Sequence, residues 1–221
     1  GGSADRLPEY ELSGQTMGTS YSIKLVAPDQ NLDRQALGVK LSARLDEINS
    51  TMSTYRPESE LSRFNRLDST EWSPVSDELC ALVADALEFS ELTDGAFDVT
   101  VGPLVNLWGF GPDGDISRPP TDAAIAEALT RVGFGKLHAN CDLPALRKDR
   151  ADVYVDLSAL AKGYAVDQSA ELLETHRVTD YLVEIGGELR MRGHNALGEL
   201  WAIAVEKPQD DTRSVQSVVR L

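Results

Sequence analysis

The sequence predicts a protein of mixed α and β structure, because helical and strand patterns alternate along its 221 residues. Several stretches carry an apolar residue at every third or fourth position, which is the period of an amphipathic helix. Other, shorter stretches alternate polar and apolar residues, which is the period of a strand. Glycine and proline stand at the borders between these stretches, where turns are expected. Together these observations favour the α+β or the α/β class.

Composition limits the classes of function. A hydrophobic content of 42% and a charged content of 26% are ordinary for a soluble globular protein of one large domain or two small ones. The net charge of −15 at pH 7 argues against nucleic acid or an anionic membrane as a partner. An anionic ligand would therefore need local positive charge or a bound metal. No apolar run reaches about 18 residues, so we predict no transmembrane helix.

Three helices are predicted in the first two thirds of the chain. The first carries an apolar stripe over residues 37–52, the second runs from about residue 76 to residue 92, and the third lies between Thr121 and Gly133. Acidic residues at 77 and 78 favour the start of the second helix, since negative charge is stabilising at a helix N-terminus. The Asp94–Gly95 pair predicts its end.

Strands are predicted in five further regions. They are residues 10–26 with an interruption at 14–19, residues 96–101 ended by Gly102 and Pro103, and residues 188–192, 201–205 and 215–221. The chain stops within the last predicted strand, so we expect the C-terminal part of the domain to be missing from it. Residues 1–9 are interpreted as a tag remnant and linker, and residues 10–221 as the domain.

The stretch from residue 153 to residue 187 predicts a strand–helix–strand crossover unit. Residues 153–155 alternate like a short buried strand, and a helix then begins at Asp156 or Ser158, both good N-cap residues. Residues 181–185 form the second predicted strand, and two glycines at 186 and 187 end it. These glycines favour either a plain turn or the close approach of a ligand to the backbone.

The start of this helix is a candidate anion site. Small residues at 159, 161 and 163 leave its N–H groups accessible, and free N–H groups at a helix N-terminus attract phosphate. Lys162 lies four residues after Ser158, so its side chain is expected to point back over the same end. We predict the phosphate of a nucleotide-like ligand here. Ser158 and Lys162 form either a nucleophilic pair or a cap beside a ligand-facing lysine, and Asp156 is either a cap or a ligand contact.

Other motifs are interpreted as structural. The glycine spacing at 109–114 fits a dinucleotide fingerprint, but a proline inside it excludes the required helix. The calcium-like start at residues 113–117 lacks the later glycine and glutamate, so we interpret it as a turn. The sequon at Asn49 falls within a predicted helix, and the three histidines are scattered. Cys80 and Cys141 fit no metal motif, and Cys80 is predicted to pack in the core.

Six blocks of residues occur in an order that is similar to one known family. They are Thr16-Met-Gly-Thr19, Ser53-Thr-Tyr55, Ser59-Glu-Leu-Ser-Arg-Phe-Asn65, Gly95-Ala-Phe-Asp-Val-Thr-Val-Gly-Pro-Leu-Val-Asn-Leu-Trp-Gly-Phe-Gly-Pro112, Asp156-Leu-Ser-Ala-Leu-Ala-Lys-Gly-Tyr-Ala-Val-Asp167 and Glu184-Ile-Gly-Gly-Glu188. From about residue 12 to its end, the chain resembles the ApbE family of FAD:protein FMN transferases.

The resemblance implies an α+β fold related to the T-fold, with mixed sheets, flanking helices and FAD between two parts of the molecule. It implies a magnesium-dependent transferase that moves FMN from FAD to a threonine of a target flavoprotein and releases AMP. The target would be a subunit of a membrane redox complex. The location would be the bacterial periplasm, with the precursor a lipoprotein anchored to a membrane. An FAD pyrophosphatase giving FMN and AMP and a non-catalytic flavin-binding protein are the alternative functions.

Carried over position by position, the resemblance implies seven FAD contacts and one metal ligand. The FAD contacts would be Met17, Tyr55, Ala96, Phe97, Asp98, Asp156 and Lys162. The backbone carbonyl of Ala159 would bind magnesium, and no catalytic residue is assigned. Family members also carry a His-x-x-Asp-Pro-x-Thr-Gly block and an Asp-x-x-x-Thr metal pair, which this sequence does not contain. We therefore expect most of the FAD surface and only part of the metal cage.

Overall fold

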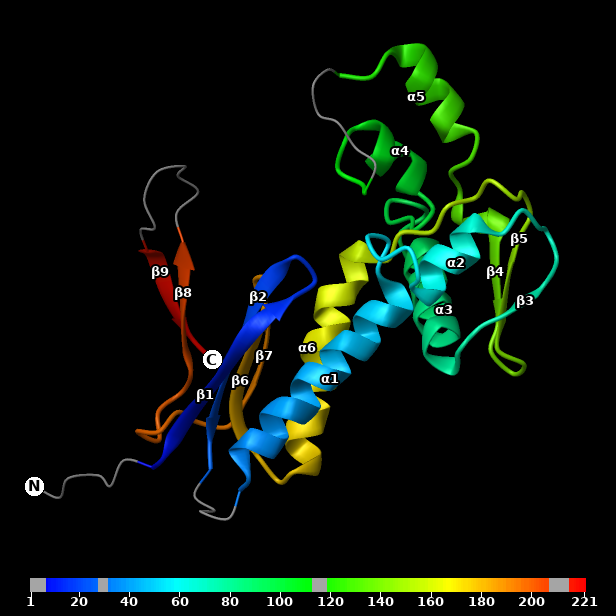
Figure 1. Cartoon of the computed structure of the whole chain (residues 1–221). Helices are drawn as coiled ribbons and strands as arrows, with labels where there is room; N and C mark the ends of the chain where they lie inside the picture. The colour runs from blue at the N-terminus through cyan, green and yellow to red at the C-terminus, as the bar shows by residue number, and fades with distance from the viewer. Residues whose placement is uncertain (1–6, 28–31, 113–118, 207–214) are drawn as a thin grey trace, which may run out of the picture. The chain divides into compact units, whose positions relative to one another are not determined.

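The structure is a computed structural model that describes residues 7–27, 32–112, 119–206 and 215–221 (Figure 1). It confirms the α+β class and divides the chain into two compact units. The terminal unit contains Gly1–Leu45 and Lys162–Leu221, and the central unit contains Asp46–Ala161. Each unit is described by itself below. Among the described residues, no helix combines the length and the apolar character that crossing a bilayer requires.

The terminal unit is built on a four-stranded antiparallel sheet in the order β1-β2-β6-β7. Its strands are β1 (Glu9–Thr16), β2 (Thr19–Val26), β6 (Asp180–Ile185) and β7 (Glu188–Arg192). They confirm the strands predicted at 10–26, 181–185 and 188–192. Parts of α1 (Arg34–Met52) and α6 (Ser158–Thr175) lie side by side along one face of this sheet (Figure 1). The guanidinium of Arg44 donates to Gln168 Oε1 at 2.8 Å and so joins the two helices.

Alternation along the strands divides the apolar residues of the terminal unit between the two faces of the sheet. On the helix face, Ile23 pairs with Val183 and Leu25 with Tyr181, and all four side chains are fully buried. The helices contribute buried residues to the same face, namely Leu37, Leu41 and Leu45 of α1 and Ala165, Ala170 and Leu173 of α6. A second cluster holds Val26, Ala196 and Trp201 against Leu182 and Met191. A separate antiparallel hairpin of β8 (Ala202–Glu206) and β9 (Val215–Arg220) confirms the last two predicted strands.

The central unit combines short helices with a three-stranded sheet in the order β3-β5-β4. Its helices are α2 (Glu60–Arg66), α3 (Asp77–Leu92), α4 (Gly102–Leu107), α5 (Asp122–Leu129) and the 3-10 turn η1 (Phe134–Lys136). Its strands are β3 (Ser73–Pro74), β4 (Leu137–Asn140) and β5 (Ala145–Lys148). The helices predicted after residues 76 and 121 are confirmed as α3 and α5, whereas α2, β4 and β5 are additional elements.

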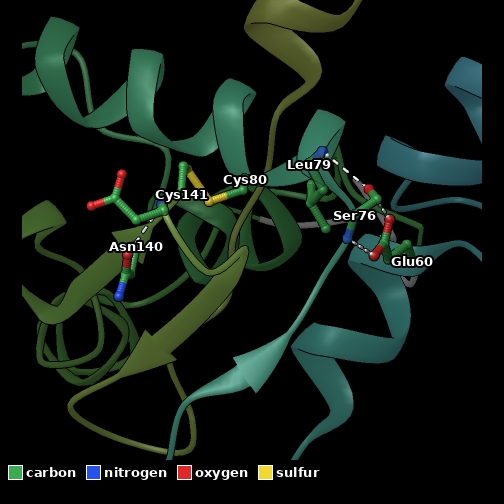
Figure 2. Close-up of a disulfide and its surroundings, with 7 residues drawn as sticks. Glu60, Ser76, Leu79, Cys80, Asn140 and Cys141 are labelled. Carbon is green, nitrogen blue, oxygen red and sulfur yellow. Dashed lines mark hydrogen bonds between the residues drawn. A yellow bond between two sulfur atoms is a disulfide. The ribbon is translucent and has the colours of Figure 1, made fainter.

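The N-terminus of α3 is fixed by hydrogen bonds to side chains (Figure 2). Ser76 is the N-cap residue, and its Oγ accepts from the N–H of Leu79 at 3.2 Å. The carboxylate of Glu60, in the first turn of α2, accepts from both the N–H and the hydroxyl of Ser76 at 2.6 Å. These bonds satisfy donors that a helix start leaves without intrahelical partners. They also tie α2 to α3.

A disulfide joins Cys80 of α3 to Cys141, the residue after β4 (Figure 2). The prediction that Cys80 is simply packed in the core was therefore wrong, although Cys80 is fully buried as expected. The two Cα atoms are 5.8 Å apart and the cysteines are separated by 61 positions. The pairing depends on the tertiary approach of α3 to β4, which spacing along the sequence does not encode.

Two predicted strands of the central unit are not strands in the structure. Residues 96–101 form turns, in which the N–H of Ala96 donates to the carbonyl of Thr93 and the N–H of Val101 to that of Asp98. Gly102 and Pro103 begin α4 instead of ending a strand, because proline is well accommodated in the first helical turn. Val153 and Val155 are buried, but residues 153–155 belong to none of the described strands. The crossover unit was therefore wrong, and β6 has antiparallel neighbours on both sides.

Candidate functional site

A cavity of about 450 Å³ lies within the central unit. Its lining comes from three segments that are far apart in the sequence. These are Tyr55, several residues between 96 and 110, and the residues at the start of α6. The full lining is Tyr55, Ala96, Phe97, Asp98, Val99, Val101, Val105, Phe110, Asp156, Ser158 and Ala159. Most of these side chains are apolar or aromatic, and two aspartates are the charged groups among the described lining residues. This combination suits a ligand with a flat aromatic part and a few polar contacts.

The turn after α3 brings Ala96 and Phe97 to the cavity. Asp94 and Gly95 both have positive φ values, 51° and 78°, and the N–H of Gly95 donates to the carbonyl of Ser90 at 2.8 Å. This left-handed ending reverses the chain as the predicted helix stop requires. The ring of Phe97 then meets that of Phe89 edge to face, with centroids 6.3 Å apart. One aromatic wall of the cavity is thereby fixed.

The carboxylate of Asp98 is engaged in holding this turn together. Its Oδ1 accepts from the N–H and the hydroxyl of Thr100 at 2.7 and 2.6 Å, and its Oδ2 accepts from the N–H of Phe134 at 2.8 Å. Asp98 thus lines the cavity, and its contact with FAD stays a prediction. Its oxygen atoms also hold residues 98–100 in a turn, where a strand was predicted.

Tyr55 and Phe110 form a linked aromatic pair at the cavity. The hydroxyl of Tyr55 donates to the carbonyl of Phe110 at 2.7 Å, although the Tyr55 side chain is 61% exposed. Phe110 is 66% exposed. Two large aromatic rings with this much exposure offer apolar area to a planar ligand. Phe110 was not predicted as a site residue, although it lies in the quoted block 95–112.

The start of α6 supplies the polar wall of the cavity. The N–H of Asp156 donates to the carbonyl of Val99 at 2.8 Å, and this bond joins the start of α6 to the turn at 96–101. Asp156 Oδ1 accepts from the N–H of Ser158, the first residue of α6, at 2.8 Å. Asp156 therefore both bonds the helix start and lines the cavity, so its two interpretations are compatible. Ser158 and Ala159 lie beside it in the first turn.

The other two predicted FAD contacts, Met17 and Lys162, belong to the terminal unit. Met17 has φ 52° and Gly18 has φ 70°, as in the two-residue turns that join antiparallel strands. Lys162 Nζ lies 2.9 Å from Glu188 Oε1 and donates to the carbonyl of Gly186 at 3.4 Å. A Cβ at Gly186 would lie 2.8 Å from Thr19 Cγ2 and 3.0 Å from Lys162 Cδ. Lys162 and the turn at Gly186 are therefore packed against the strand that follows Met17.

The structure thus brings five of the seven predicted FAD contacts to one cavity, together with Ala159. These five are Tyr55, Ala96, Phe97, Asp98 and Asp156. Met17 and Lys162 are associated with a different feature, the turn end of the β1-β2-β6-β7 sheet. All seven remain predictions as ligand contacts. The pairing of Lys162 with Glu188 is the main point that helical spacing did not anticipate.

The described residues do not by themselves form a magnesium site. Over the part of the chain that the structure describes, no three His, Cys, Asp or Glu side chains come together. Magnesium requires about six oxygen ligands in octahedral geometry, usually with at least one carboxylate. The carbonyl of Ala159 would supply one of these ligands, and the Asp98 carboxylate is already committed to backbone partners.

The remaining motifs have structural roles where the structure describes them. Asn49 of the sequon lies within α1 and is 7% exposed, which argues against glycosylation. His138 Nε2 lies 2.8 Å from Asp149 Oδ1, and His176 Nε2 lies 3.0 Å from Lys40 Nζ. The calcium-like residues and the last glycine of the dinucleotide-like spacing lie outside the described residues.

Fold and site together define an α+β protein with a cavity of about 450 Å³ at the start of α6. Residues 17–221 match the ApbE family, and the chain belongs to this family. It is 44% identical over 211 residues to the FAD:protein FMN transferase of Vibrio cholerae and 42% identical over 215 residues to that of Haemophilus influenzae. These alignments include 96% and 95% of this chain. The chain spans only 63% and 62% of the length of these two relatives.

Solved structures of the family have the same fold. The flavin transferase ApbE from Vibrio cholerae superimposes with a TM-score of 0.90 at 44% identity, over 96% of this chain and 68% of that one. The apo form of the flavinyl transferase ApbE from Pseudomonas stutzeri gives a TM-score of 0.86 at 36% identity, over 98% and 68%. The α+β architecture implied by the resemblance is therefore confirmed.

Proposed function

We propose that this protein transfers FMN from FAD to a threonine of a target flavoprotein. The observation that carries the proposal is the convergence of Tyr55, the 96–98 turn and Asp156 on one cavity at the start of α6. Residues from three distant segments line this one cavity, and the resemblance implies each of them as an FAD contact. The relatives named FAD:protein FMN transferase support the same reaction.

The reaction breaks the phosphoanhydride bond of FAD and forms a phosphoester. The threonine hydroxyl attacks the phosphorus on the FMN side, the hydroxyl proton passes to water, and AMP leaves with the electron pair of the broken bond. In this proposal the diphosphate of FAD lies at the start of α6, because the N-terminal end of a helix carries partial positive charge. The N–H of Ser158 is already bonded to Asp156 Oδ1. Tyr55, Phe97 and Phe110 offer aromatic surface to the flavin or adenine ring.

Magnesium dependence is part of the proposal on the strength of the resemblance. Divalent metal neutralises charge on diphosphate oxygens in phosphoryl transfer. Such an ion would be consistent with the acidic character of a chain with net charge −15. Since the resemblance assigns only the Ala159 carbonyl among the described residues to the metal, we assign no step of the mechanism to the metal.

The test is a transfer assay with the protein, FAD, magnesium and a threonine-bearing target. We expect a flavin-fluorescent target band that survives denaturing electrophoresis, since a phosphoester is covalent. The band should disappear with EDTA and with a target whose acceptor threonine is replaced by alanine. Free FMN formed equally with and without the target would instead indicate FAD hydrolysis. FAD binding with neither product would indicate a flavin-binding protein.

We also propose a target in a membrane redox complex and a periplasmic location with a lipid-anchored precursor. The disulfide supports the location, because disulfides persist in oxidising compartments and are rare in the reducing cytosol. Fractionation of cells into periplasm, membrane and cytosol would test it. Recovery of the protein only from the cytosol with reduced cysteines would contradict this part of the proposal.

Replacing Asp156 by asparagine should weaken FAD binding without unfolding the protein. Asparagine keeps the oxygen that accepts from the N–H of Ser158 and caps about as well as aspartate. It loses the charge and half of the acceptor capacity that a nucleotide donor would use. A charged hydrogen bond is worth roughly 1.5–3 kcal/mol, so the Kd for FAD should rise at least about tenfold. Flavin fluorescence titration measures the Kd, and thermal melting without ligand should barely change.

A matched control is Asp122→Asn, which alters an aspartate in the first turn of α5. Asp122 is outside the cavity lining, so its variant should keep the parent Kd. An unchanged titration for Asp156→Asn would reduce Asp156 to a structural cap.

A further inference from the structure

Asn65, near the end of α2, forms two hydrogen bonds with the backbone of Val155, the residue before Asp156. Its Nδ2 donates to the carbonyl of Val155 at 2.8 Å, and its Oδ1 accepts from the N–H of Val155 at 2.8 Å. One carboxamide therefore satisfies both backbone groups of one residue. This is the pairing that a neighbouring strand would otherwise supply.

Val155 needs such a partner because it is buried but belongs to none of the described strands. Its side chain is fully buried, as is that of Leu157, and Val153 is 1% exposed. Buried backbone N–H and C=O groups are costly when they have no hydrogen-bond partner. The alternating pattern of residues 153–155 is typical of a strand. Asn65 takes the place of the missing strand partner.

The pairing continues directly into the cavity wall. Beyond Val155, the N–H of Asp156 donates to the carbonyl of Val99, and Asp156 Oδ1 accepts from the N–H of Ser158. Each of these bonds depends on the backbone path set at the preceding residue. Asn65 thus lies at the head of a series of bonds that orients the Asp156 carboxylate and the first turn of α6.

The position of Asn65 is itself well determined. Leu61 and Phe64 of α2 are 0% and 3% exposed, so the helix is anchored in the core. The buried ammonium of Lys148 donates to the carbonyls of Leu67 and Ala151 at 2.8 and 2.7 Å, and to that of Asn65 at 3.4 Å. A side chain on a fixed helix end can impose its geometry on the segment that it contacts.

We propose that Asn65 is a positioning residue for FAD binding, which acts by holding Val155 so that Asp156 and the start of α6 face the ligand. The proposal rests on the proposed function. Asn65 does not belong to the described cavity lining, so any effect on FAD must pass through the residues that it orients. A purely structural role would affect stability alone.

A double-mutant cycle on FAD affinity tests this coupling. Asn65→Ala removes both hydrogen bonds, and Asn65→Asp keeps the acceptor for the Val155 N–H while replacing the donor. Each variant should raise the Kd for FAD about tenfold in the parent protein and less than about threefold in the Asp156→Asn background, since coupled residues are not additive. Asn65→Asp retains one bond and serves if Asn65→Ala does not fold. Equal fold-changes in both backgrounds would overturn the proposal.

Amide hydrogen exchange of the ligand-free protein provides a readout that needs no FAD. In the Asn65 variants the amides of Asp156 and Ser158 should exchange at least about tenfold faster, while that of Leu79 at the start of α3 should not change. Faster exchange at Val155 alone, with Asp156 and Ser158 still protected, would overturn the proposal.

The matched control is Asn195→Ala in the terminal unit. Asn195 Oδ1 accepts from the N–H groups of Leu197 and Glu199 at 2.9 and 3.1 Å, so its loss also removes two bonds from a side chain to the backbone. This variant should lower the melting temperature without changing the Kd for FAD or the exchange at Ser158. A parent protein that binds FAD but transfers no FMN would contradict the proposed transfer alone, since the Asn65 measurements follow binding and local exchange.

Discussion

Loss of the Cys80–Cys141 disulfide is expected to lower the free energy of unfolding by about 4 kcal/mol. The bridge closes a chain segment with a sequence separation of 61, and closing a loop of this size removes conformational entropy from the unfolded state. The loop-entropy relation gives about 4 kcal/mol at 25 °C, and removed native disulfides typically cost about 2–5 kcal/mol. For a domain of this size the melting temperature should fall by roughly 10 °C. Calorimetry or chemical denaturation of oxidised and reduced protein measures the difference.

The variant Cys141→Ser separates the bridge from the packing around it. Cys80 is fully buried whereas Cys141 is exposed, so Cys141→Ser breaks the disulfide and keeps the Cys80 sulfur in the core. Reduced parent protein and Cys141→Ser should therefore have equal stability. A reduced protein as stable as the oxidised one would show that the loop is already constrained by α3 and β4 without the bridge.

Helices and hairpins were predictable where a repeated apolar pattern faces a single core. The stripe of α1 at Leu37, Leu41 and Leu45 lies against the sheet because its period matches that of the helix. The strands β1, β2, β6 and β7 follow from alternation, and their turns follow from glycines that tolerate positive φ at 18, 186 and 187. In these elements local sequence and tertiary burial favour the same conformation.

The errors share one cause, which is that contacts made by side chains decide the structure where the local pattern favours another one. Residues 96–101 look like a strand, but the Asp98 carboxylate binds Thr100 and Phe134 and folds the segment into turns. Residues 153–155 look like a strand as well, and Asn65 satisfies Val155 from 90 positions away. The disulfide is likewise a contact between side chains that are 61 positions apart. Contacts between distant residues depend on the finished fold, so a local pattern cannot reveal them.

The candidate site was predictable in two different ways. The small residues and good capping residues around Ser158 predict an anion site from elementary helix chemistry, and the structure begins α6 at Ser158. Tyr55 and Phe97, by contrast, have no local signal of ligand binding and were implied only by family resemblance. Neither approach indicated that the Asn65 side chain bonds the backbone of Val155. The sequence therefore predicts which residues the site contains more readily than which residues hold them in place.

The buried ammonium of Lys148 is a second determinant of stability in the central unit. Lys148 is 1% exposed, and its Nζ donates to the carbonyls of Phe64, Asn65, Leu67 and Ala151. Burial lowers the pKa of Lys148, and the nearby carboxylates of Asp152 and Asp68 oppose this effect. A buried cation that binds the last carbonyls of α2 replaces donors that the helix end lacks.

We therefore expect Lys148→Met to reduce the free energy of unfolding by about 3 kcal/mol, because methionine keeps the apolar stem but leaves buried carbonyls without a donor. Lys136→Met is the matched control. Lys136 Nζ donates to the carbonyls of Thr130 and Val132 near the end of α5, but its side chain is only half-buried and water can replace it. This control should cost less than about 1 kcal/mol by urea denaturation. Equal losses for the two variants would show that the carbonyls bonded to Lys148 find other donors. The end of α2 would then not depend on this cation.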